Sequence, residues 1–121
     1  MYVRGKADSP RGGELDELRS HILLQAGDAA ESNLSITWVD VAPGAAQAEN
    51  RHEPEQVYVV IAGRGRMHIG AESRELEVGE MAHVPGNVPH YIVNSGSEML
   101  SYISAATPAF DVKSNYGPKK A

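Results

Sequence analysis

The chain contains no cysteine among its 121 residues. Disulfide bonds, thiolate metal ligands and a thiol nucleophile are therefore excluded, and any bound metal must be held by nitrogen and oxygen donors. Long apolar runs are missing too, since no segment approaches the roughly 20 apolar residues of a membrane helix. Residues 1–13 are charged and lack the apolar stretch of a signal peptide, so the cytoplasm is the expected location.

Basic residues are few compared with acidic ones. Lys and Arg number 11 against 16 Asp and Glu, which gives a formal net charge of −5. A nucleic-acid partner requires clustered Lys and Arg, so no such partner is expected, and no membrane partner either. A chain of 121 residues has room for one domain with one core.

Short apolar segments alternate with turn residues from residue 33 onward. Leu34, Ile36 and Trp38 recur at every second position, which is the period of a β-strand. Further strands are expected at 56–62, 66–69, 74–78, 81–84, 90–93 and 99–105, with Gly, Pro or Asn between them. Many short strands at regular spacing predict an all-β sandwich or barrel.

Three regions follow from this pattern: an N-terminal arm packing on the barrel (1–32), the barrel itself (33–112) and a polar C-terminal tail (113–121). The arm contains one ambiguous segment, residues 14–24. Leu15, Leu18 and Ile22 fall near helical spacing, but residues 21–24 fit a strand equally well. This segment is therefore expected to form either one short helix or two short extended pieces.

Two histidines and two amides are the candidate metal ligands. Asn50, His52 and Gln56 are separated by even intervals, so on a strand their side chains share one face, although Pro54 interrupts the strand and permits a bulge. His90 follows a Pro-rich loop on a later strand. Two neighbouring strands of a small barrel could bring the four side chains together, and imidazole nitrogen and amide oxygen are both competent metal donors.

The spacing around these residues resembles the first sequence motif of the cupin family. That motif reads Gly, five residues, His, one residue, His, three or four residues, Glu, six residues, Gly. The same intervals occur here at Gly44, Asn50, His52, Gln56 and Gly63. Asn50 therefore replaces the first His of the motif, and Gln56 replaces its Glu.

The second cupin motif follows fifteen residues after the first. It reads Gly, five residues, Pro, one residue, Gly, two residues, His, three residues, Asn. The matching positions are Gly79, Pro85, Asn87, His90 and Asn94. Asn87 replaces a loop Gly, a small change because Asn tolerates left-handed backbone better than most residues. The resemblance covers roughly two-thirds of the chain and is specific for fold, whereas the fold hosts many activities.

The resemblance implies an all-β double-stranded β-helix, or jelly-roll barrel, around one divalent metal ion, either Zn, Ni, Mn or Fe. His52 and His90 would be ligands, Gln56 would bind through its amide oxygen, and Asn50 would either ligate or hydrogen-bond a metal-bound water. This Asn, His, Gln, His set is similar to small cupins related to polyketide-pathway proteins. Cupins with Gln at the Glu position also include some that act on uronate sugars.

The substitutions determine what such an ion could do. All four groups are neutral, so the ion would keep its full +2 charge, which favours Lewis-acid chemistry. The two-His, one-carboxylate set of iron oxygenases is not met, which makes oxygenase chemistry less expected. Glu53 and Glu55 are expected in solvent, but a bulge at Pro54 would let one of them supply the missing carboxylate.

The resemblance implies a metal-dependent isomerase, cyclase or lyase that acts on a small oxygenated substrate such as a keto-sugar or polyketide. Tyr58 and His90 are candidates for proton transfer, and Trp38, His83 and Tyr102 are candidate pocket residues. The alternatives are a metal-dependent dioxygenase and a non-catalytic barrel that binds a small ligand. Small single-barrel cupins commonly form dimers, so a homodimer is expected.

Overall fold

The computed structural model describes residues 1–12 and 16–109. Within these residues the chain forms one short 3₁₀ helix and eight strands. They are η1 (Lys6–Asp8), β1 (Leu18–Leu24), β2 (Ser35–Val41), β3 (Glu55–Ala62), β4 (Arg64–Ile69), β5 (Glu72–Glu77), β6 (Met81–Val84), β7 (His90–Asn94) and β8 (Leu100–Thr107). The predicted all-β class is confirmed. The predicted tail, 113–121, and the end of the predicted barrel, 110–112, lie outside the described residues.

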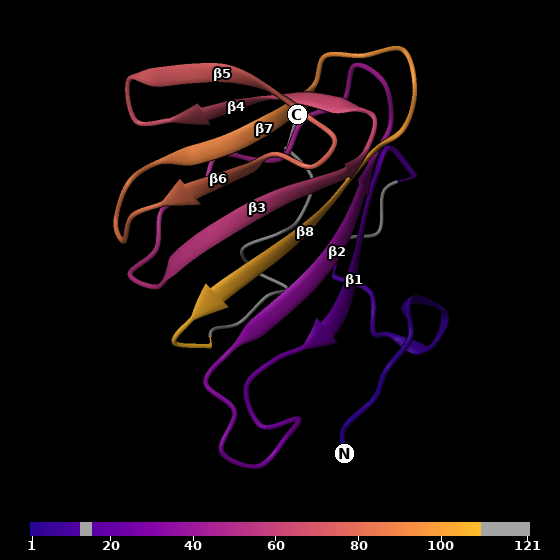
Figure 1. Ribbon diagram of the computed structural model, residues 1–121, viewed down its shortest axis with the longest axis vertical. Helices are drawn as coiled ribbons and strands as arrows, with labels where there is room; N and C mark the ends of the chain where they lie inside the picture. The colour runs from indigo at the N-terminus through magenta and orange to yellow at the C-terminus, as the bar shows by residue number, and fades with distance from the viewer. Residues whose placement is uncertain (13–15, 110–121) are drawn as a thin grey trace.

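The strands form two antiparallel sheets. Five strands pair in the order β1-β2-β8-β3-β6, and three pair in the order β5-β4-β7. Figure 1 shows the strands stacked one beside another, with β5 at one end of the stack and β1 at the other. The segment 45–50 continues the smaller sheet, because Ala46 and Asn50 form isolated bridges with Val93 and His90 of β7. The two sheets enclose the interior of a jelly roll.

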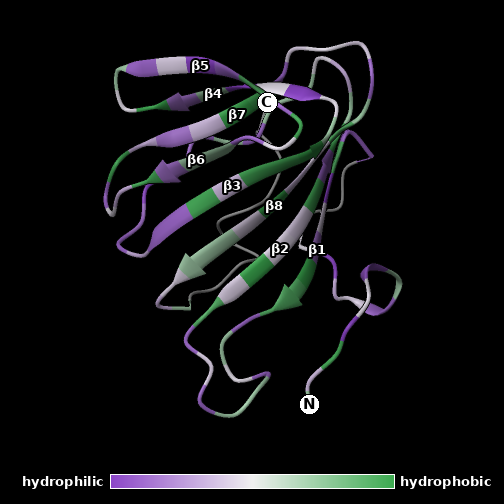
Figure 2. Cartoon of the chain, viewed as in Figure 1, coloured by the Kyte–Doolittle hydropathy of each residue, from purple (hydrophilic) through white to green (hydrophobic). Residues whose placement is uncertain are grey.

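Alternation along each strand decides which side chains enter that interior. In β3 the buried residues are Gln56, Tyr58 and Val60, while the residues between them are only partly buried. A single apolar cluster, which includes Val39, Met67 and other residues of both sheets, forms the core of the barrel. Hydrophobic colour is concentrated on β1, β2, β3 and β8, whereas β5 is mostly hydrophilic (Figure 2).

The ambiguous segment of the N-terminal region contains a strand, while its residues 14 and 15 lie outside the described part of the chain. Residues 18–24 form β1, which pairs with β2 from Leu18 opposite Val41 to Leu24 opposite Ile36. The preceding arm extends the sheet further, since Gly12 N donates to Ser20 O and Ile22 N donates to Pro10 O, at 2.8 and 2.9 Å. The edge of β2 offers unpaired backbone groups that a helix could not satisfy. Among the described residues, no helix has the length and apolar character to cross a membrane.

Two loops meet at the rim of the barrel where β3 begins. Asn87 N donates to His52 O at 2.7 Å, and a side chain on Gly86 would collide with the carbonyl oxygen of Glu53. Asn87 has a φ of 63°, the left-handed conformation that Asn adopts more readily than most residues. This packing holds the loop before β7 against the segment before β3, and so brings the two halves of the candidate site together.

Candidate metal centre

His52 and Gln56 face each other at the start of β3. His52 Nδ1 lies 2.8 Å from the carbonyl oxygen of Pro54. A carbonyl only accepts, so Nδ1 carries a hydrogen, and a ring with its single hydrogen on Nδ1 presents a lone pair at Nε2. That Nε2 atom is 2.9 Å from Gln56 Oε1, while Gln56 Nε2 donates to Ser104 Oγ at 2.6 Å. Two acceptor atoms therefore point toward the same place.

His90 presents a third lone pair. Its Nδ1 donates to Val88 O at 2.8 Å, which fixes the tautomer and leaves Nε2 as an acceptor. The residue is only 1% exposed, and Nε2 has no hydrogen-bond partner within residues 1–12 and 16–109. A buried polar atom without a partner costs about 1–3 kcal/mol, so this nitrogen fits a ligand role better than a purely structural one.

The backbone places His90 beside His52. Asn50 and His90 form an isolated antiparallel bridge in which each N donates to the other's O at 2.8 Å. The rings of His52 and His90 meet edge to face with centroids 4.8 Å apart. Directly opposed residues of an antiparallel pair share one face, so half-buried Asn50 projects on the same side as His90. The structure therefore brings all four predicted ligand residues to one rim of the barrel.

Burial sets the protonation of His90. Loss of solvent is the largest effect and lowers the pKa of His90 below its ordinary value. The hydrogen bond to Val88 O opposes this shift, His52 lowers the pKa further, and the charge of Glu49 raises it. The net shift is downward, so His90 is neutral at pH 7, the form in which imidazole can bind a metal.

These donors fit a divalent metal ion. Two ligands with bonds of about 2.1 Å and a right angle at the ion lie about 3 Å apart, close to the 2.9 Å between His52 Nε2 and Gln56 Oε1. No group of three or more His, Asp or Glu side chains that could hold a metal occurs in the described part of the chain. Metal binding here would depend on amide oxygen as well as imidazole, as the motif substitutions predict.

Tyr58 and Tyr102 line the interior next to these histidines. Both are fully buried, and their rings stack with centroids 4.9 Å apart. The Tyr58 ring lies edge to face with the His90 ring at 6.1 Å. Tyr58 OH donates to Gln47 Oε1 at 2.8 Å. The sequence reasoning missed Gln47, because residues 45–49 were counted only as the spacer between Gly44 and Asn50; the one available signal was a single amide within a run of alanines.

Trp38 and His83 lie away from the interior. Trp38 Nε1 donates to Asp40 Oδ1 at 2.9 Å, and Lys6 Nζ sits 4.9 Å from the centre of its ring, on the outer face of the larger sheet. His83 is exposed and contacts Glu55 Oε1 at 3.0 Å. The structure does not bring these two predicted pocket residues to the metal centre. Glu53 is exposed as well, so neither it nor Glu55 supplies an inward carboxylate.

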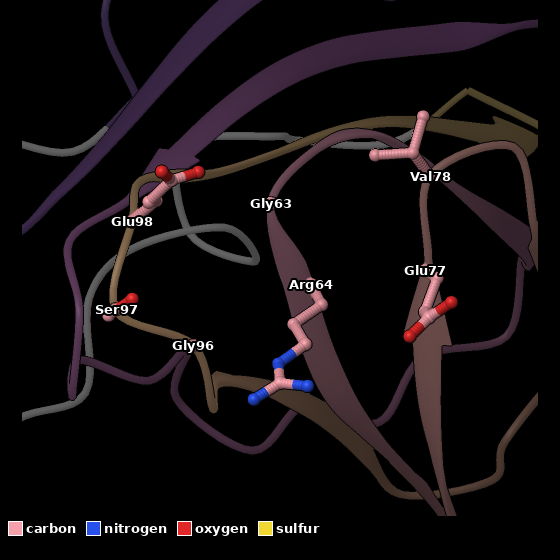
Figure 3. A pocket seen from close by; sticks show the side chains of 7 residues that line it. All are labelled: Gly63, Arg64, Glu77, Val78, Gly96, Ser97 and Glu98. Atoms are coloured by element: carbon pink, nitrogen blue, oxygen red, sulfur yellow. The ribbon is translucent and has the colours of Figure 1, made fainter.

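One surface depression lies away from these residues. It has a volume of about 470 Å³ and lies around the turn between β3 and β4. Figure 3 shows Arg64, Glu77 and Glu98 around it, together with Val78 and Ser97. Gln56 is the second residue of β3 and Gly63 follows its end, so this depression is at the opposite end of β3 from Gln56. Its size alone does not connect it with the histidine and amide cluster.

The fold and the cluster together define a single-barrel protein with a candidate metal centre of imidazole and amide donors. The family model described as the cupin domain matches residues 37–106, and the chain belongs to the cupin family. An uncharacterized protein of Streptomyces coelicolor is 29% identical over 82 residues, which cover 63% of this chain and 76% of that protein.

Two further similarities concern an enzyme and a solved structure. The dimethylsulfoniopropionate lyase DddW of Ruegeria pomeroyi is 27% identical over 86 residues, covering 71% of this chain and 56% of the lyase. The chain thus matches little more than half of that enzyme's length. The crystal structure of an RmlC-like cupin from Shewanella frigidimarina superposes with a TM-score of 0.75 at 18% identity, covering 92% of this chain and 94% of the other. This second likeness concerns the fold.

Proposed function

We propose that the protein is a metal-dependent isomerase, cyclase or lyase that acts on a small oxygenated substrate such as a keto-sugar or a polyketide. The observation that carries the proposal is the convergence of His52 Nε2, Gln56 Oε1 and the unpaired His90 Nε2 at one rim of the barrel. The similarity to an enzyme named as a lyase supports this class of reaction.

A divalent ion at this centre would act as a Lewis acid that polarises a carbonyl or stabilises an enolate. His52, His90 and the amide oxygen of Gln56 would hold it, with Asn50 either as a fourth ligand or as a partner of bound water. The chain itself fixes these donors: Pro54 O and Val88 O set the tautomers of the two rings, and Ser104 Oγ orients the Gln56 amide. Such outer contacts typically change metal affinity about 10- to 100-fold when removed.

The buried walls of the barrel suit an oxygenated, uncharged or anionic substrate. The buried polar residues of the described chain are Ser, Thr, Asn, Gln and His, with no Asp, Glu, Lys or Arg among them. The barrel thus offers neutral donors and a stacked tyrosine pair to such a substrate. Of the two predicted proton-transfer residues, Tyr58 already donates its hydrogen to Gln47, whereas His90 Nε2 is buried without a partner among the described residues.

Proton exchange tests the proposal directly. The protein would be loaded in turn with Zn²⁺, Ni²⁺, Mn²⁺ and Fe²⁺ and incubated with keto-sugars and 1,3-diketones in D₂O, with deuterium uptake at the carbon next to the carbonyl followed by NMR. Uptake that requires metal and is lost in His52→Ala is the expected result. No uptake with any metal would contradict the proposal, and oxygen consumption that requires Fe²⁺ would indicate a dioxygenase instead.

We also propose that the protein forms a homodimer through the outer face of its larger sheet. Two cross-strand rows of partly exposed apolar side chains lie on this face: Trp38, Ile103, Val59 and Met81 in one, and Ile36, Ala105 and Val57 in the other. An apolar groove of about 200 Å³ adjoins the second row. Contiguous apolar surface on a small domain is typical of a protein interface.

A further inference from the structure

Gln47 is a buried amide that the metal centre does not use. It lies in the segment beside β7, where its backbone N donates to Ile92 O at 3.0 Å. The residue is 1% exposed, and its side chain oxygen accepts the hydrogen of Tyr58 OH at 2.8 Å. The other half of the amide, Nε2, has no hydrogen-bond partner among the residues that the structure describes. One side of the amide is therefore fixed, and the other is a buried donor with nothing to donate to.

A second unpaired donor lies on the wall of the interior formed by the larger sheet. Thr37 is fully buried, and Thr37 Oγ1 also lacks a partner within the described residues. Thr37, Ser104 and Tyr58 are paired directly across β2, β8 and β3, so their side chains form one row on the inner face. The Tyr58 ring in turn contacts the His90 ring. The unpaired atoms of His90, Gln47 and Thr37 thus all belong to one polar interior.

The chemistry of these atoms restricts what they can bind. An amide Nε2 only donates, so its partner is an oxygen acceptor. The buried residues of the described chain include no carboxylate, so no buried side chain repels an anionic ligand. Buried polar groups in native proteins have partners in the great majority of cases, so an unpaired buried amide donor indicates an acceptor that the described residues do not supply.

We propose that Gln47 is a ligand-binding residue that donates a hydrogen bond from Nε2 to an oxygen of the bound molecule other than those held at the His52, Gln56 and His90 centre. Tyr58 is its positioning residue, because the Tyr58 hydroxyl fixes which end of the amide is free. The ligand class is a compound with at least three oxygens, such as a dicarboxylate or a hydroxylated dicarbonyl. This inference rests on the proposed function, since it assumes that the centre holds a metal-bound ligand.

Two chelating ligands test whether Gln47 donates a hydrogen bond to the bound molecule. Malonate can bind a metal through two oxygens and still has two more that can accept a hydrogen bond, whereas pentane-2,4-dionate has only its two chelating oxygens. Binding of each to Co²⁺-loaded protein would be followed by the visible absorption of the ion. The double variant Gln47→Met, Tyr58→Phe removes the pair together and leaves no new unpaired hydroxyl. We expect malonate to bind about tenfold more weakly, the loss of one hydrogen bond, and pentane-2,4-dionate to bind unchanged.

Two controls separate binding from folding. Gln25→Met makes the same change in the β1–β2 connection and should leave both affinities unchanged. The metal-free double variant should unfold at the same temperature as the wild type or higher, because it removes an unpaired buried donor, and its Co²⁺ content should be unchanged.

Four results would overturn the inference. Unchanged malonate binding in the double variant, equal weakening of both chelators, or a wild type that binds pentane-2,4-dionate but not malonate would each exclude a Gln47 contact while leaving the proposed metal function in place. A wild type that takes up no Co²⁺ would remove the proposed function and this inference together.

Discussion

His52 Nε2 and Gln56 Oε1 lie 2.9 Å apart, and when the single ring hydrogen of His52 is on Nδ1 both atoms present lone pairs. Pro54 O takes the hydrogen of the His52 ring, and Ser104 Oγ takes a hydrogen of the Gln56 amide, so the surroundings of each residue turn its acceptor atom toward the other. Two acceptors at this distance repel unless a cation or a proton lies between or beside them. The pair is therefore the most informative contact in the barrel for the proposal of a metal centre.

Removal of the unpaired imidazole tests the ligand set. His90→Ala should lower Zn²⁺ affinity by a factor of about 100 or more, since it deletes one donor of a small neutral set. The measurement is competition with a chromophoric chelator. His83→Ala is the matched control, because His83 is exposed and pairs with Glu55 on the surface, and it should change the affinity by less than about twofold. Equal losses in the two variants would exclude His90 as a specific ligand.

Gln56→Glu should bind divalent metal about tenfold more tightly than the wild type. A carboxylate adds a negative charge where the wild type has a neutral amide, and oxygen anions are stronger donors for these ions. Gln56→Leu, of similar size but without a donor atom, should instead lose most of the affinity. Both values come from the same chelator competition. If the wild type and both variants had the same metal affinity, residue 56 would not contact the ion.

The metal-free protein should lose stability as the pH falls below about 6.5. Burial lowers the pKa of both His90 and His21 in the folded state, with Lys6 and Arg11 adding to the effect at His21. Between the ordinary value near 6.5 and the lower folded value, the unfolded chain binds more protons. The free energy of unfolding is thus fully present above that range and decreases as the pH falls through it.

Urea unfolding at several pH values between 8 and 5, in the presence of EDTA, measures this dependence. His21→Gln and His90→Gln should each make the decline shallower, because each removes one group that takes up a proton on unfolding. A free energy of unfolding that rises from pH 7 to pH 5 would contradict the assignment of both rings as neutral in the folded protein.

Val59→Glu should convert the proposed dimer to a monomer. The side chain lies between Ile103 and Met81 in the outer apolar row, so a buried charge there would cost several kcal/mol in an interface. Val93→Glu places the same charge on the outer face of the smaller sheet, opposite Arg66, and should leave the mass unchanged. Light scattering during gel filtration gives both masses. A wild type that is already monomeric at high concentration would exclude the dimer.

The sequence predicted the strand pattern and the two motif histidines because both depend on the spacing of residues along the chain. Gly44 and Gly79 stand at motif positions with φ of 81° and 90°, a conformation that favours glycine. Residues 14–24 could not be decided in the same way. Leu18, Ser20 and Ile22 are buried in β1, but so is His21 beside Asp40, which disrupts the apolar alternation that would have indicated a strand.

The facing of β2 shows why pocket residues were harder to predict. Ser35, Thr37 and Val39 are buried inward, while Ile36 and Trp38 lie on the outer face. Parity alone favours the apolar Ile36 and Trp38 for the core. In this strand the polar Ser35 and Thr37 face inward instead, and Lys6 of the arm partly covers Trp38 on the outer face. Gln47 was missed for a related reason, since it lies in no strand and its role depends on a contact with Tyr58 that only folding creates.

Metal content tests the central claim most directly. Purified protein reconstituted with a divalent metal and dialysed would be measured by mass spectrometry of the metal, and its crystals by anomalous scattering at the edge of that metal. The account predicts about one ion per chain, within bonding distance of His52 Nε2, His90 Nε2 and Gln56 Oε1. No retained metal after reconstitution with Zn²⁺, Ni²⁺, Mn²⁺ and Fe²⁺ in turn, or an ion held elsewhere on the chain, would contradict it.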